Sequence, residues 1–393
     1  MVTNIAKNGL TARYLRFIGG ALCLLIVASN IWTMSRWSER RGVVDDLCYL
    51  RQAHLFQKFG HRGLDTNIAL ETDNYFKTLV SEAGHPEWYE INPWCHVQMA
   101  ATGKFVIQYP PGTGFLLAAF PEGFQVIPLY ATATVLISLM ALVAINFARS
   151  RASIAAATVF GCVALYFMIN PTKASYSLAP TMVVCALVGL LTAALFNTRG
   201  RLPRLGITFL VGLLLGLSVC FRIANLVLSA GYFVAFLIAF VRSRRLDNFW
   251  QGLVFGLAHL IGLTPTLLAN AINAGSPFST TYGPDDTQTR DFAFSVARQY
   301  FADLQGGLVF VALVGIALIM IQRSSQPLRQ IAIVVAVNLL VNLVFFLSHP
   351  IFQQYYIMPV AMLSLWSLLF GGLMQNRLSV TAVPSRIKDA VAV

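Results

Sequence analysis

Long apolar runs separated by short polar segments follow one another along almost the whole chain. A helix needs roughly 20 apolar residues to cross about 30 Å of hydrocarbon, and about ten runs approach that length. The pattern therefore predicts an all-α integral membrane protein with about ten transmembrane helices. The predicted spans cover residues 14–34, 124–148, 153–170, 178–197, 205–221, 224–241, 249–271, 307–322, 330–348 and 357–375.

The spans define one polytopic membrane domain, residues 14–375, between an N-terminal segment 1–13 and a polar tail 376–393. The first apolar run is longer than the core of a secretory signal, and no small-x-small cleavage site follows it. We therefore interpret it as a permanent helix. The polar segments predict a large loop at 35–121, between the first two spans, and a second loop at 272–306.

Composition agrees with a membrane protein, since 57% of the residues are hydrophobic and 11% are charged, against about 25% charged in soluble domains. The net charge is +12, but the basic residues of the short loops gather on one side of the predicted spans. This asymmetry is the positive-inside pattern, which places both termini in the cytoplasm and argues against a nucleic-acid partner. Every acidic residue except Asp247 and Asp389 falls on the opposite side, where we expect the chemistry.

The large loop carries its own pattern. Apolar positions at helical spacing predict an amphipathic helix over residues 44–59 that lies along the membrane surface. Residues 113–120 are apolar but too short to span, and they predict a second surface helix that ends at Pro121. Cys48 and Cys95 are the only cysteine pair in this loop, and an oxidising compartment would allow a disulfide. The sequence leaves that pairing open.

Two adjacent carboxylates, Asp45 and Asp46, open the predicted surface helix, with Tyr49 one turn further on. The helix N-terminus stabilises them as anions, and an ionised carboxylate can act as a general base toward a hydroxyl group. The alternative is a helix N-cap beside a solvated acid, which is the more common use of such residues.

A rigid corner follows later in the loop, at Tyr109-Pro110-Pro111-Gly112. The prolines fix φ, and the glycine permits a turn or a close backbone approach. Lys104 and Gln108 lie just before this corner. A plain turn into a surface helix explains the same residues, and both interpretations can hold together.

Arg222 falls between two spans with almost no loop around it. A charge placed so deep is costly and usually has a partner or ligand, and a guanidinium is well suited to phosphate. Snorkelling to the interface is the alternative. Further polar features are Gly275-Ser276-Pro277-Phe278 with Tyr282 beyond it, and His349 followed by Tyr355 and Tyr356.

The order of these features resembles the GT-C superfamily of polytopic glycosyltransferases. It is closest to the bacterial branch that resembles protein O-mannosyltransferases and the lipid A aminoarabinose transferase. The shared order is an acid pair after the first span, a Pro-Pro corner, a Gly-Leu-x-x-x-x-Arg segment, Gly-Ser-Pro-Phe, and Tyr-Tyr-x-x-Pro near the last span. It runs over residues 14–375 and identifies a superfamily, not a substrate.

The resemblance implies an inverting transfer of a sugar from a polyprenyl-phosphate donor to a lipid or glycan acceptor, on the periplasmic face of a bacterial inner membrane. It implies that Asp45 is the base, with Asp46 the second acid, and that Arg222 binds the donor phosphate. Many relatives have Lys directly before the two prolines, where this chain has Tyr109. Lys104 is then the candidate substitute, and Lys173 is a further cation that could meet the phosphate charge. The other expected substrate-binding residues are Tyr49, Tyr109, His349, Tyr355 and Tyr356.

We expect no metal ion and no cofactor other than the lipid-linked sugar, because the sequence has no zinc spacing, phosphate loop or dinucleotide fingerprint. The main alternative function is a multi-span lipid or polysaccharide transporter or flippase. Transporters tend to have inverted repeats and charged residues near the middle of the membrane, whereas this chain concentrates its acidic residues outside and shows no repeat.

Overall fold

The structure is a computed structural model that describes residues 2–38, 44–90, 93–168, 175–282, 291–322, 324–349 and 351–381. Lys173, Asp285 and Asp286 lie outside these ranges, as does Pro350. The described chain is mainly helical, with two short strands, as the apolar pattern predicts.

Nine helical segments of the described residues are long and apolar enough to cross a bilayer, which confirms an all-α, multi-pass membrane protein. One of them joins a short 3₁₀ helix, η4 (Ile223–Ser229), to α10 (Ala230–Ser243). The others are α1 (Val2–Met34), α6 (Val126–Phe147), α8 (Leu178–Asn197), α9 (Arg201–Val219), α11 (Leu246–Ala274), α13 (Leu304–Ile321), α14 (Gln326–Leu347) and α15 (Met358–Thr381).

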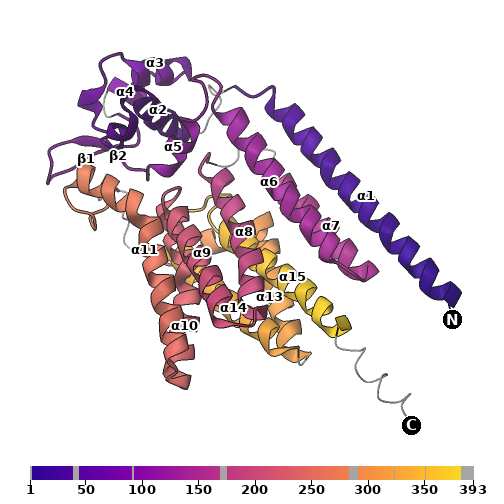
Figure 1. Cartoon of the computed structure of the whole chain (residues 1–393). Coiled ribbons are helices and arrows are strands. Elements are labelled where there is room, and N and C mark those ends of the chain that lie inside the picture. The colour runs from indigo at the N-terminus through magenta and orange to yellow at the C-terminus, as the bar shows by residue number, and fades with distance from the viewer. Residues whose placement is uncertain are drawn as a thin grey trace, which may run out of the picture.

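The one remaining predicted span, 153–170, corresponds to the shorter helix α7 (Arg151–Tyr166). Its 16 residues rise about 24 Å at 1.5 Å per residue, less than the roughly 30 Å hydrocarbon core. Ser150 caps its start by accepting a hydrogen bond from the Ser153 backbone. Figure 1 shows α7 beside α6 and α1, with α8 to α11 and α13 to α15 forming the rest of the bundle.

Small residues hold the bundle together at its closest helix contacts. Gly212 and Gly216 of α9 face the backbone of α11, and a Cβ on Gly262 of α11 would lie 2.6 Å from the Leu217 backbone nitrogen. Gly189 of α8 similarly faces the fully buried Trp366 of α15. Because lipid gives apolar side chains little reason to associate, such close backbone packing supplies much of the contact energy.

The large loop folds into a polar subdomain, residues 44–120, at one end of the bundle (Figure 1). The N-terminal end of α1 and the end of α15 lie at the opposite end of the bundle. The polar subdomain contains α2 (Val44–Phe59), η2 (Gly60–Leu64), η3 (Ile68–Leu70), α3 (Tyr75–Glu82), α4 (Glu87–Glu90), β1 (His96–Gln98), β2 (Phe105–Ile107) and α5 (Gly112–Leu117). The two strands pair antiparallel, with Val97 opposite Val106.

Helix α2 has the predicted bounds, but more of it is covered than its amphipathic pattern suggests. Leu47, Leu50 and Ala53 are buried, as expected for the apolar stripe. Arg51 and Gln52 on other faces are buried too, because the rest of the polar subdomain surrounds the helix. The helix is therefore the core of a small folded unit, with more than one face buried.

Arg51 organises that unit from inside. Its Nε donates to the Glu71 carboxylate at 2.8 Å, and its Nη1 donates to the Thr66 carbonyl at 2.9 Å. The same Nη1 lies 3.0 Å from Nε2 of His96, whose Nδ1 lies 2.7 Å from the Trp94 carbonyl. This arrangement fits a neutral imidazole that donates from Nδ1 and accepts at Nε2.

Burial and, as a smaller cause, the nearby charge of Arg51 together lower the pKa of His96 from 6.5 to about 3. His96 then binds a proton below about pH 6.5 in the unfolded chain, but only below about pH 3 in the folded protein. Folding stability should therefore fall as the pH falls through this window, at up to about 1.4 kcal/mol per pH unit. Thermal unfolding in detergent between pH 7 and pH 4 would measure the loss.

His61 provides the control for this prediction, because it is an exposed histidine of the same subdomain. His61→Gln should leave the pH dependence unchanged, whereas His96→Gln should flatten it. Equal slopes in His96→Gln and the unmodified protein would contradict the assignment.

A disulfide joins Cys48 of α2 to Cys95, just before β1, with the Cα atoms 6.6 Å apart. It ties the core helix to the hairpin across 47 positions of sequence. Cys48, Cys95 and His96 are close enough together to form a metal-ligand group. The bond occupies both sulfurs, however, and Arg51 faces the free imidazole nitrogen, so these residues do not fit a cation in this state.

Candidate functional site

Side chains from five separate segments meet where the polar subdomain joins the bundle. We call them the Asp45–Arg222 cluster: Asp45, Tyr49, Tyr109, Arg222, Tyr282, Tyr355 and Tyr356. Six of these seven residues are ones that the sequence singles out as site candidates. The structure thus brings together positions that lie more than 300 residues apart in the chain.

The two adjacent acids have different surroundings. Asp46 is fully buried, and its Oδ1 accepts a hydrogen bond of 2.8 Å from the backbone nitrogen of Tyr176. This bond holds the segment that leads into α8, where an anion is favoured by the helix N-terminus. Asp45 is only partly buried. Asp46 therefore has a structural contact, and Asp45 is the acid that an incoming group can reach.

Asp45 lies against Tyr109, which donates a side-chain hydrogen bond to it. The Tyr109 hydroxyl in turn accepts a hydrogen bond of 3.0 Å from Nε2 of Gln108. Thr281 donates to the Gln108 carbonyl at 2.9 Å and so fixes this segment against the chain beyond α11. A Gln108–Tyr109–Asp45 series thus orients the carboxylate.

Arg222 occupies a break between α9 and η4. Its backbone is extended, with φ −151° and ψ 127°, so the helix stops and restarts around it. Asn225 stabilises the break by donating to the Ser218 carbonyl at 2.8 Å and to the Thr181 hydroxyl at 3.0 Å. The interruption explains why a charged residue can sit between two apolar segments, since the break brings the guanidinium to the end of the span.

The proline corner packs directly on this break. The Gly112 nitrogen donates to the Cys220 carbonyl at 2.7 Å, and Thr113 contacts the Phe221 carbonyl at 3.5 Å. Pro110 and Pro111 are buried in the contact. The corner therefore does more than turn the chain, since it attaches the polar subdomain to the backbone beside Arg222.

A side chain at position 112 should disturb this attachment. A Cβ there would lie 2.7 Å from the Cys220 carbonyl oxygen, and backbone atoms have little room to move. We expect Gly112→Ala to cost about 1–3 kcal/mol, the usual range for overpacking, and to lower the unfolding temperature in detergent. Gly256→Ala is the control, because no atom lies within 4 Å of a Cβ at that position. Equal unfolding temperatures for the two variants would contradict the packing role of Gly112.

The guanidinium of Arg222 is held by aromatic rings. Its central carbon lies 4.8 Å from the centre of the Tyr355 ring and 5.5 Å from that of Tyr356, within the range of cation–π attraction. Its Nη1 is buried, and none of the described residues hydrogen-bonds to it. A buried guanidinium donor without an acceptor is costly, so this nitrogen is suited to an anionic ligand.

The segment that carries the two tyrosines is fixed by Gln305 at the start of α13. Gln305 is fully buried, donates from Nε2 to the Gln353 carbonyl at 3.1 Å, and accepts at Oε1 from the Ile357 nitrogen at 3.0 Å. Because both ends of the amide are used, the segment between 353 and 357 has a defined position. The segment thus holds the rings of Tyr355 and Tyr356 against the Arg222 guanidinium.

The tyrosines of the cluster are proton-holding groups at neutral pH. Burial raises the pKa of Tyr109 well above its usual value, and the neighbouring Asp45 raises it further. Burial also raises the pKa of Tyr49 and Tyr355, which Arg222 partly offsets. These phenols therefore remain protonated and serve as hydrogen-bond donors and aromatic surfaces around the Asp45 carboxyl group.

Two predicted site residues have other surroundings, and a third lies outside the described residues. Lys104 pairs with Asp65 at 2.7 Å and donates to the Ile272 carbonyl at 2.9 Å, so its described contacts attach the polar subdomain to the end of α11. His349 lies at the end of α14, with its Nδ1 3.1 Å from the Phe345 carbonyl. Lys173 lies outside the described residues. The structure thus leaves Arg222 as the one predicted phosphate ligand that it places in the cluster.

The sequence did not mark two residues here as site residues, namely Tyr282 of the cluster and Ser177 beside it. Tyr282 packs on Tyr109, with the ring centres 6.2 Å apart, and Tyr49 makes a side-chain hydrogen bond with Ser177. Tyr282 follows the Gly-Ser-Pro-Phe segment, which was the available signal. Ser177 had none, because its proximity comes from the contact between Asp46 and Tyr176.

Comparison with known proteins adds no assignment to this geometry. No protein-family model matches the sequence, and no match is found among curated proteins. The function must therefore be argued from the cluster itself.

Proposed function

We propose that the protein transfers a sugar from a polyprenyl-phosphate donor to an acceptor hydroxyl, by a GT-C-type inverting mechanism. The observation that carries the proposal is the convergence of a partly exposed carboxylate and a guanidinium with a free donor in one tyrosine-lined cluster. The carboxylate suits the acceptor hydroxyl, which must lose a proton, and the guanidinium suits the leaving phosphate, which gains negative charge.

In this mechanism Asp45 accepts the proton of the acceptor hydroxyl as its oxygen attacks the anomeric carbon of the sugar. A new carbon–oxygen bond forms on one face of the sugar while the bond to the phosphate oxygen breaks on the other. The polyprenyl phosphate leaves with the bonding electron pair. Arg222 stabilises the negative charge that grows on the phosphate.

Other residues of the cluster prepare this step. Gln108 and Tyr109 orient the Asp45 carboxylate, and the rings of Tyr355 and Tyr356 hold the guanidinium. The position that is Lys in many GT-C relatives is Tyr109 here, and its hydrogen bond with Asp45 gives it a different task. We assign Tyr109 the role of orienting Asp45, and not that of binding the phosphate.

The proposed location is the periplasmic face of a bacterial inner membrane, with both termini in the cytoplasm. The positive-inside pattern supports this orientation, and the ends of α1 and α15 lie opposite the polar subdomain (Figure 1). A long prenyl chain would lie in the bilayer beside the bundle while the phosphate reaches Arg222.

The test is to incubate the purified protein in lipid nanodiscs with radiolabelled polyprenyl-phosphate sugars and a membrane lipid extract. Glycosyl transfer predicts that the label moves from the prenyl lipid to an acceptor and that polyprenyl phosphate is released. A flippase would move the intact donor across a vesicle membrane without cleaving it. Intact donor in every nanodisc reaction would contradict the proposal.

A further inference from the structure

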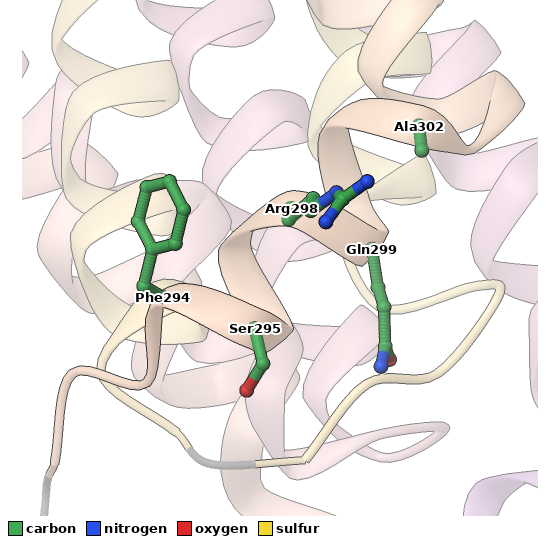
Figure 2. A pocket seen from close by; sticks show the side chains of 5 residues that line it. All are labelled: Phe294, Ser295, Arg298, Gln299 and Ala302. Atoms are coloured by element: carbon green, nitrogen blue, oxygen red, sulfur yellow. The ribbon is translucent and has the colours of Figure 1, made fainter.

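Helix α12 (Phe294–Ala302) has two faces with different surroundings. Val296, Ala297 and Tyr300 are buried against the protein. The opposite face lines an open groove, shown in Figure 2, whose residues recur at positions one, two, five, six and nine of the helix. This spacing places on one helical stripe the five lining residues Phe294, Ser295, Arg298, Gln299 and Ala302.

The inner face of α12 is already used. The Tyr300 hydroxyl donates to the Ile351 carbonyl at 3.1 Å, and its ring lies 4.9 Å from that of Phe352. Both partners belong to the segment that leads to Tyr355. The helix is thus fixed to the protein on one side, and the grooved stripe is the side that remains to meet its surroundings.

The position of α12 along the chain indicates what those surroundings are. One residue, Asp303, separates it from the spanning helix α13, and Asp303 caps α13 by accepting from the Gln305 nitrogen at 3.1 Å. A helix joined so closely to the end of a span lies where hydrocarbon meets lipid headgroups. Phe294 and Phe301 are 77% and 62% exposed, which water would disfavour and this interface would not.

We propose that the α12 groove binds a phospholipid of the surrounding bilayer, with its phosphate on Arg298 and an acyl chain along Phe294. A planar guanidinium matches phosphate oxygens, and the polar ends of Ser295 and Gln299 can meet the ester groups of the same lipid. Helix α13, which follows directly after Asp303, exposes Phe310 and Leu313. The exposed apolar side chains on both helices favour a lipid over a soluble partner, and the inference does not depend on the proposed transfer reaction.

The test places a photoreactive benzophenone amino acid at one exposed position at a time in the full-length protein. Nanodiscs of phosphatidylglycerol and phosphatidylethanolamine supply the probe lipids, and mass spectrometry identifies the adducts. The positions are Phe294 in the groove, Leu313 in α13 as the lipid-facing reference, and Ser81 in α3, at the far edge of the polar subdomain in Figure 1. Phospholipid adducts are expected at Phe294 and Leu313 and not at Ser81.

Arg298→Gln in the Phe294-labelled protein tests the headgroup contact. A basic residue near a membrane surface contributes about 1 kcal/mol, so the adduct yield should fall about fivefold. The Leu313 adduct should be unchanged in the same variant. Adducts at Leu313 without any at Phe294, protein adducts in place of lipid ones, or an Arg298→Gln yield equal to that of the parent would each overturn the proposal.

Discussion

Asp45→Asn is expected to lower the rate of sugar transfer about 10²–10⁴-fold, the usual contribution of a positioned general base. The amide has the same shape but cannot accept the acceptor's proton. Donor binding should survive, because Arg222 and its tyrosine neighbours are untouched. The measurement is the initial rate of label transfer in nanodiscs, together with the binding of polyprenyl phosphate to the same preparation.

Glu82→Gln is the matched control, since Glu82 is an exposed acid at the end of α3 in the same subdomain. It should transfer sugar at the rate of the unmodified protein. If Asp45→Asn kept more than about half of the activity, when removal of a base should cost a hundredfold or more, Asp45 could not be the base.

Arg222→Gln is expected to lower transfer by about 10²–10³-fold, the cost of removing one donor from a developing negative charge. Unlike the Asp45 variant, it should also weaken the binding of polyprenyl phosphate, because the guanidinium already faces the phosphate before the reaction. Arg222→Lys should have a transfer rate between those of the unmodified protein and Arg222→Gln, since lysine keeps the positive charge but lacks the planar guanidinium. Transfer rates and phosphate-lipid binding measured side by side would separate these effects.

Arg201→Gln provides the control at the other end of α9. Arg201 begins α9, is exposed, and pairs with Asp247 at 3.2 Å, about 30 Å along the helix axis from Arg222. Its replacement should change neither binding nor transfer. A similar loss in both variants would mean that positive charge in general, not the position of Arg222, determines activity.

Hydropathy predicted the spans well because the length of a membrane-crossing helix is set by the bilayer, which acts on each segment separately. Residues 178–197 form α8 with the predicted bounds, and the helix over 44–59 was also predicted correctly. The segment 153–170 was less accurate, since apolar composition alone does not fix where a helix ends. Ser150 starts this helix before the predicted span, and its described end is Tyr166.

Tertiary contacts explain what local pattern could not predict. Arg51 falls within the predicted amphipathic helix, but inside the polar subdomain it donates to the Glu71 carboxylate and lies against the His96 imidazole. Lys104 was a candidate phosphate ligand because it lies a few positions before the proline corner. In the structure it pairs with Asp65 and donates to the Ile272 carbonyl at the end of α11. Such partners lie 20 to 168 positions away in the sequence, so no local pattern contains them.

The sequence singled out six of the seven residues of the cluster, but it did not predict which of them are in contact. Asp45, Arg222 and Tyr355 were singled out by residue type and by the order of motifs. Their meeting depends on the Gly112–Cys220 contact and on the buried Gln305 amide. The Cys48–Cys95 disulfide was likewise left open, because sequence cannot give the distance between two Cα atoms.

The central claim is that the phosphate of a prenyl lipid binds at Arg222 while Asp45 faces the same space. An experimental structure of the protein in nanodiscs with polyprenyl phosphate tests it most directly. We predict the phosphate within about 3 Å of the Arg222 guanidinium nitrogens, the distance of a charge-assisted hydrogen bond. A phosphate bound elsewhere on the bundle, with the Asp45 carboxylate closed off from it, would contradict the account.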